Sequence, residues 1–156
     1  MVVIGINTAN TRLSTETPEF ALGTLGRVNG SENIYKYIKY NPGSTPVTAV
    51  AGNMTFYYAA AGVSDGTDTT VTCFATDSQA LGAGVLMAAI PNNGYGWIQV
   101  TGVATLTTAL TSGAAGNALC GGAANSTLKV CALVTDFQCA VCLHAVNKQV
   151  LLTCPL

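Results

Sequence analysis

The densest group of reactive side chains is the run Cys139-Ala-Val-Cys142-Leu-His144. Two thiols and the single histidine of the chain could bind zinc through sulfur and nitrogen if a tight turn brought both sulfurs to one point. The run instead alternates like a β-strand, so residues 139 and 142 should face opposite sides. No second close cysteine pair completes a four-ligand shell. We therefore expect no metal site and no cofactor.

The chain contains six cysteines, and their context favours plain packing. A redox cysteine usually lies at the amino terminus of a helix within a βαβ pattern, which this sequence does not predict. The opening run MVVIGINTANTR lacks the basic leader and apolar core of an export signal, and cytosolic thiols are kept reduced. The sequence predicts free thiols buried in a β core. They are Cys73, Cys120, Cys131, Cys139, Cys142 and Cys154.

Other candidate motifs are incomplete. His144 has no nucleophile or orienting carboxylate placed beside it by the sequence, as a catalytic triad requires. The pair Asp65-Gly-Thr-Asp68 offers too few oxygen ligands for a calcium loop, and it suits a hairpin turn. The run Leu81-Gly-Ala-Gly-Val85 lacks the further residues of a nucleotide-binding loop. We expect no enzymatic activity.

The segment Asn92–Gly102 predicts a tight turn that enters a strand. Alternation places Tyr95, Trp97 and Gln99 on one face of that strand. Large aromatic side chains are enriched both in cores and at the centres of interfaces. Core packing is favoured for Trp97, whereas Tyr95 suits packing and partner contact about equally.

The elements that would position these residues are short β-strands between turns rich in Asn, Gly and Pro. Asp77-Ser78 could cap a short helix that follows them, although Gly82 and Gly84 disfavour it. The sequence predicts an all-β fold, a single compact β-barrel or sandwich with an extended N-terminal arm. The expected strands are Ile34–Tyr40, Met54–Tyr58, Thr69–Thr76, Tyr95–Val103, Thr127–Thr135, Cys139–Val146 and Val150–Thr153.

The first twenty residues differ from the rest of the chain. The run Thr8–Glu19 is polar and shows neither the helical nor the strand period. Such a segment suits a flexible tail or an arm that becomes ordered against a neighbour. We divide the chain into an arm, residues 1–20, and a β-rich domain, residues 21–156.

The charge distribution indicates burial against other chains. Charged residues make up 8% of the sequence, the net charge is -1, and the span Ser78–Leu128 contains no Asp, Glu, Lys or Arg. No basic field exists that could neutralise phosphates, so nucleic acid is not expected as a partner. Polar residues interrupt every apolar stretch well short of the roughly 20 residues of a spanning helix, so no membrane is expected either.

Several runs, in this order and spacing, are similar to tailed-bacteriophage head decoration (capsid cement) proteins. They are Pro18-Glu-Phe-Ala-Leu-Gly-Thr-Leu-Gly26, Tyr35-Lys-Tyr-Ile, Gly52-Asn-Met, Gly84-Val-Leu-Met-Ala-Ala-Ile-Pro, Gly94-Tyr-Gly-Trp-Ile-Gln-Val and Ala114-Ala-Gly-Asn. The cysteine-rich carboxy-terminal third departs from that pattern.

The resemblance implies a virion structural protein, made in the host cytoplasm, that binds the capsid exterior and stabilises the shell. The implied partners are the major capsid protein and further copies of the chain in a small cyclic oligomer, for which we expect a trimer. The interface residues we expect are Tyr95, Trp97, Phe20 and Arg12. The alternatives are a head-fibre or tail-associated β module and, less favoured, a small thiol or zinc protein using Cys139, Cys142 and His144.

Overall fold

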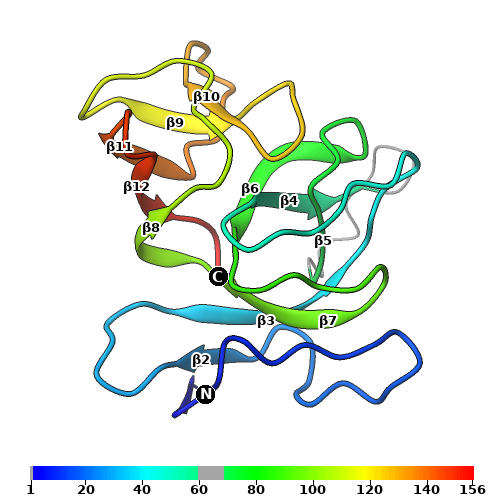
Figure 1. Cartoon of the computed structure of the whole chain (residues 1–156). Helices are drawn as coiled ribbons and strands as arrows, with labels where there is room; N and C mark the ends of the chain where they lie inside the picture. Colours follow the sequence, from blue (N-terminus) through cyan, green and yellow to red (C-terminus); the bar gives the residue numbers. More distant parts are fainter. Residues whose placement is uncertain (1, 60–68) are drawn as a thin grey trace.

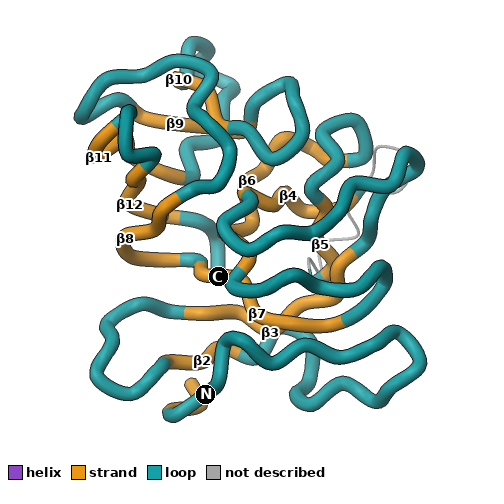
Figure 2. Tube along the Cα trace, in the orientation of Figure 1, coloured by secondary structure: helices purple, strands orange, loops and turns teal. Residues whose placement is uncertain are grey.

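The structure is a computed structural model that describes residues 2–59 and 69–156. All regular elements in these ranges are β-strands joined by turns and loops (Figure 2), which confirms the predicted all-β class. The acidic turn Asp65–Asp68 lies outside the described residues.

Five strands close into a barrel, as the sequence predicted. The hydrogen-bonded order is β3-β5-β4-β6-β7, and β7 pairs back onto β3. This closing pair is antiparallel and runs from Tyr35 opposite Gln99 to Lys39 opposite Tyr95. The five strands are β3 (Tyr35–Tyr40), β4 (Met54–Tyr58), β5 (Thr70–Thr72), β6 (Ser78–Leu86) and β7 (Tyr95–Gln99).

A second sheet of five antiparallel strands lies beside the barrel, at the upper left of Figure 1. The chain enters it directly from β7 through Val100, so the barrel wall continues into the sheet. The strand order is β10 (Leu128–Val130), β9 (Ala118–Gly121), β11 (Ala140–His144), β12 (Gln149–Thr153) and β8 (Thr101–Thr105).

The extended arm crosses the outside of the barrel below β3 and β7 (Figure 1). Its strand β1 (Val2–Ile4) pairs in parallel with β2 (Leu25–Arg27), and β2 adds to β3. Farther along the arm, Arg12 exchanges backbone hydrogen bonds with Tyr95, with N···O distances of 2.9 and 3.0 Å. The arm therefore extends over the chain's own barrel.

Two cores result because β3 and β7 are covered on both faces. Ile38 and Ile98 face the main core, which fills the barrel and continues under the second sheet. Tyr37 and Trp97, on the opposite face of the same strands, form a smaller core with Ile6 of the arm. The alternation predicted for β7 is thus correct, and β3 alternates in the same way.

Several sequence-based predictions need correction. The expected strand Thr69–Thr76 ends at Thr72. Four observed strands were not predicted: Val2–Ile4, Leu25–Arg27, Ser78–Leu86 and Ala118–Gly121. The alternative of a helix after Asp77-Ser78 is wrong, since β6 begins at Ser78 and pairs with both β4 and β7. Glycines in β6 permit close approach to the neighbouring strands, because a Cβ at Gly84 would collide with the carbonyl oxygen of Gln99. The expected strand Tyr95–Val103 is two strands in different sheets, and the expected strand Thr127–Thr135 ends at Val130.

Candidate functional site

The structure brings the four expected interface residues together at the contact between arm and barrel. Arg12 lies within the arm, and Phe20 is the last residue of the arm. The other two residues, Tyr95 and Trp97, lie on β7. The rings of Phe20 and Trp97 meet edge to face, with their centroids 5.2 Å apart. Tyr37 of β3 completes an aromatic trio, with its ring 5.1 Å from that of Trp97.

Trp97 lies inside this contact and is only 1% exposed. Its indole nitrogen Nε1 has no hydrogen-bond partner among the described residues. Desolvation by burial raises the pKa of Tyr37, whose hydroxyl accepts a hydrogen bond from the Glu19 amide at 3.2 Å. Trp97 and Phe20 therefore pack the arm onto the barrel.

Arg12 and Tyr95 remain partly accessible at the same place. The Arg12 guanidinium lies 3.8 Å from the Glu19 carboxylate, and both side chains are well exposed. Exposed pairs of this kind contribute little to stability. The backbone exchange between Arg12 and Tyr95, rather than the ion pair, fixes how the arm lies.

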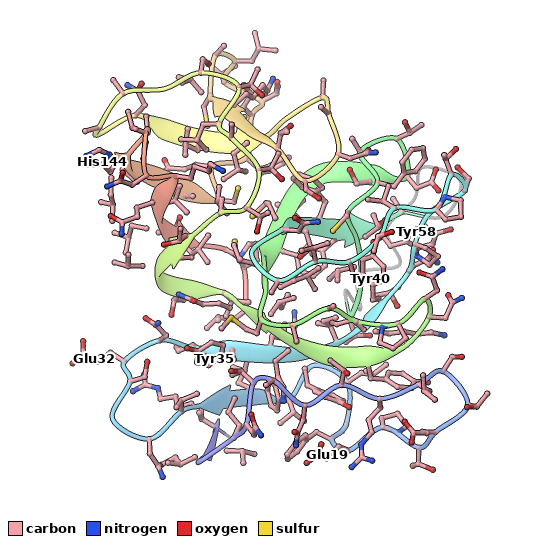
Figure 3. The ribbon with its side chains drawn as sticks, viewed as in Figure 1. Glu19, Glu32, Tyr35, Tyr40, Tyr58 and His144 are labelled. Carbon is pink, nitrogen blue, oxygen red and sulfur yellow. The ribbon has the colours of Figure 1, made fainter. Side chains whose placement is uncertain are left out.

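The residues considered for zinc do not converge. The expectation that Cys139 and Cys142 face opposite sides is wrong, since both are fully buried in the main core. Cys139 precedes the first residue of β11 and packs against Gly82 of β6. His144 lies at the far end of β11, on the outer side of the second sheet (Figure 3), and its Nδ1 accepts a hydrogen bond from the Asn147 amide at 3.3 Å. Within residues 2–59 and 69–156, no group of three acidic, thiol or imidazole side chains could hold a metal ion.

The outer face of the second sheet carries an apolar row. Val103 faces Leu151, Leu151 faces Val141, and Val141 faces Ala118, so one row crosses β8, β12, β11 and β9. Val103 is 52% exposed and Leu151 is 38% exposed. Directly opposed residues share a face of a sheet, so these four side chains form one surface, which we call the outer row.

On β8 and β12, the neighbours of the outer row are polar but uncharged. Thr105 faces Gln149 on one side of the row, and Thr101 faces Thr153 on the other. Exposed apolar surface with a polar rim is typical of a site where another protein binds. Covering the part of the surface on β8 and β12 would not require the removal of a charged group from water.

Residues 131–138 form a loop that folds against the same side of the sheet. The Asp136 carboxylate accepts hydrogen bonds from the amides of Ala132 and Leu133 at 2.8 and 3.0 Å. It also lies 3.7 Å from Lys129 of β10. The two backbone hydrogen bonds lower the pKa of Asp136, and this carboxylate thus fixes the start of the loop.

The tip of this loop is apolar and projects into solvent. Leu133, Val134 and Phe137 are all strongly exposed, and Phe137 retains 66% of its accessible surface. The outer row and the loop tip together form the candidate contact surface.

The free edge of β8 is protected against pairing with another strand. The Gln99 side-chain amide donates hydrogen bonds to the carbonyl oxygens of Thr101 and Val103 at 3.0 and 2.9 Å. A hollow of about 390 Å³ lies along this edge, lined among others by Gly52, Met87 and Leu106. Occupied edge carbonyls disfavour strand addition, so the exposed face of the sheet, rather than this edge, is suited to contact.

Residue patterns alone did not reveal this surface. Three consecutive apolar residues in a strand, Val150-Leu-Leu152, must place at least one apolar side chain on each face, and this signal is present in the sequence. In the structure, Val150 and Leu152 lie in the core and Leu151 lies outside. The order of the strands, which joins Leu151 to Val103 and Val141, was not visible.

These features define the class of the protein as an all-β domain with a closed barrel, a second sheet and a neutral exposed face. No family model, curated protein or solved structure matches the chain. In the part of the chain that the structure describes, no helix is long and apolar enough to cross a membrane.

Proposed function

We propose that this chain is a virion structural protein that binds the exterior of a tailed-phage capsid and stabilises the shell. The observation that carries the proposal is the outer row with its uncharged neighbours on β8 and β12, an exposed surface suited to burial against a neighbouring subunit. The resemblance of the runs from Pro18 to Asn117 to decoration proteins supports the same function.

The mechanism is stabilisation by selective binding. A subunit that binds the assembled shell but not its separated parts stabilises the assembly by mass action. Each contact can be weak, because a lattice repeats it many times. Burial of apolar side chains such as Val103 and Leu151 supplies a favourable free energy in proportion to the area removed from water.

The partners in this proposal are the major capsid protein and further copies of the chain in a small cyclic oligomer. A closed ring of identical subunits uses one repeated interface and leaves a second surface for the shell. Arg12 of the arm and Tyr95 of β7 are accessible for such a contact, whereas Trp97 supports it from behind.

The first test compares particles that carry this protein with particles that lack it. We expect the decorated particles to survive higher temperature and removal of divalent ions. Equal survival of both, with the protein located only at a tail or fibre, would refute decoration in favour of the fibre module.

A matched pair of variants tests the surface itself. Val103→Glu adds a charge to the outer row, and Val50→Glu adds one at a valine of similar exposure in a loop outside the sheet. We expect Val103→Glu to lower binding to shells at least tenfold, while Val50→Glu binds as the unmodified protein does. Equal binding of the two variants would show that the outer row is not the contact.

A further inference from the structure

The six free thiols occupy three different kinds of environment. Cys120 and Cys131 lie next to each other, and so do Cys139 and Cys154. Cys73 and Cys142 are buried singly in the main core. Cys131 alone among the six is not buried. The protein thus contains one thiol pair that solvent can reach and one that it cannot.

Strand register places Cys120 and Cys131 on one face. Cys120 of β9 lies opposite Lys129 of β10, and the Cys131 amide donates a hydrogen bond of 3.0 Å to Ala118, two residues before Cys120. Cys131 is therefore the diagonal neighbour of Cys120 on the same side of the sheet, within reach of its side chain. The two thiols are close enough for each to affect the ionisation of the other.

A disulfide between them requires only a small movement. Diagonal neighbours have Cα atoms about 7 to 8 Å apart, just beyond the usual range for a disulfide, so the backbone must move by about an ångström to form the bond. Cys131 follows the last residue of β10, where the backbone leaves the strand and can adjust.

The two thiols differ in exposure, so a reagent in solution can react with them only one after the other. Cys131 is partly exposed, whereas Cys120 is buried below it. Burial, together with the neighbouring Cys131 thiol, raises the pKa of Cys120 to about 12, so Cys120 keeps its proton until Cys131 has reacted. An incoming reagent meets Cys131 first, and Cys120 then lies in place to attack it.

We propose that Cys120 and Cys131 form a dithiol that a small-molecule disulfide, such as oxidised glutathione, converts into an intramolecular disulfide. The Cys131 thiolate attacks one sulfur of the reagent, which forms a mixed disulfide and releases one glutathione thiolate. Cys120 then loses its proton to water and attacks the Cys131 sulfur, which releases the second glutathione. Two electrons pass from the pair of cysteines to one disulfide of the reagent.

The new bond would connect the start of the apolar loop to β9. The bond would enclose residues 121–130 in a covalent loop. It would also fix Cys131, the first residue of the loop that carries the exposed side chains Leu133, Val134 and Phe137. Cross-linking two strands lowers the conformational freedom of the unfolded chain, so the oxidised protein unfolds at a higher temperature than the reduced one.

The test uses the full chain with its buried pair as an internal control. The folded, reduced protein is incubated with oxidised glutathione at pH 8, the free thiols are alkylated, and the cysteines are mapped by mass spectrometry. We expect two thiols to disappear, the mass to fall by two hydrogen atoms, and Cys120 to be linked to Cys131. Cys139 and Cys154, which are neighbours but 0% and 5% exposed, should stay reduced.

Two variants separate the steps. Cys120→Ser should accumulate one glutathione on Cys131, and Cys131→Ser should not react. Six free thiols in the treated unmodified protein, a stable mixed disulfide on Cys131, or a link between Cys139 and Cys154 would each overturn the proposal.

Discussion

At the scale of single residues, Phe20 connects the arm to the barrel. Its ring contacts both Tyr37 and Trp97, with centroids 5.5 and 5.2 Å away, and it covers the indole from solvent. Trp97 is the only tryptophan in the chain, so its fluorescence reports directly on this contact.

Replacement of Phe20 by alanine should loosen the arm. We expect Phe20→Ala to lower the free energy of unfolding by about 2 kcal/mol, less than for a fully buried phenylalanine because Phe20 is half-buried. The emission of Trp97 should shift to longer wavelength as water reaches the indole. Denaturant unfolding and emission spectra measure the two effects.

Leu13→Ala is the matched control for this prediction. Leu13 lies on the same arm, but its side chain is 53% exposed, so its loss should change stability by less than about 0.5 kcal/mol. An unchanged emission spectrum in Phe20→Ala would contradict the role given to this ring.

Sequence reasoning identified Trp97 as a packing residue but not its partner. Alternation within one strand is enough to place Trp97 and Tyr95 on one face. Nothing local indicates that Phe20, far away in the sequence, would cover that face, since this depends on how the arm crosses the barrel.

At the scale of elements, the arm is separate from the main core. No described residue before Ile34 belongs to that core, and the described part of the arm contributes to the smaller core through residues such as Val3 and Ile6. The barrel closes through β3 and β7 without the arm.

Deletion of residues 1–17 should therefore leave a folded protein. We expect cooperative unfolding at a lower midpoint temperature, because β1 and the Ile6 contact are lost, and weaker incorporation into the assembly. Calorimetry and shell binding measure these effects. Arg12→Ala is the control, since it keeps the backbone exchange with Tyr95 and should behave nearly as the unmodified chain does.

Loss of cooperative unfolding in the deletion would show that the arm is an integral part of the domain. Retained binding to shells would show that the arm makes no necessary contact there.

The strands differ in how well the sequence predicted them. Met54–Tyr58 was predicted with its observed bounds, because an apolar and aromatic run between turns has few alternatives. The short strand Leu25–Arg27 was missed because three residues are too few to show a period. Its packing against Ile6 and Trp97 at Gly26 depends on how the arm folds over the barrel, which the local sequence does not indicate. Ser78–Leu86 was ambiguous because alanine and glycine indicate neither helix nor strand on their own.

At the scale of the whole molecule, buried hydroxyl and thiol groups make stability depend on alkaline pH. Burial raises the pKa of Tyr40 and of Cys73. The hydrogen bond to Cys139, followed by burial, raises the pKa of Cys154. Each group keeps its proton in the folded protein at a pH where the unfolded chain would lose it.

The free energy of unfolding should therefore be unaffected by these groups below the ordinary thiol pKa of about 8.5 and should fall as the pH rises above it. Each thiol that ionises only on unfolding contributes about 1.4 kcal/mol per pH unit to this fall. Denaturant titrations between pH 7 and 10.5 under reducing conditions would measure the slope.

Cys73→Ala removes one of these groups and should make the slope shallower. A free energy of unfolding that stays constant through this range, or an unchanged slope in Cys73→Ala, would contradict the assignment.

The charge distribution was the most useful feature of the sequence at this scale. The uncharged span Ser78–Leu128 includes β7, β8 and β9, which contribute to the barrel wall and to the second sheet. It indicated a surface that needs covering, but the particular face could not be predicted, because it depends on the pairing of strands distant in sequence.

The closure of the barrel also determines how the chain must fold. Tyr35 pairs with Gln99, and Thr101 pairs with Thr153, so both sheets depend on contacts between distant parts of the chain. Such contacts form slowly, on the order of milliseconds to seconds, because the entropy of the intervening chain is lost before the contacts stabilise it. Until β7 arrives, the long edge of β3 is unpaired and can join another chain. Newly made copies can therefore aggregate through the edge of β3 before it pairs with β7. A high local concentration of incompletely folded chains increases this aggregation.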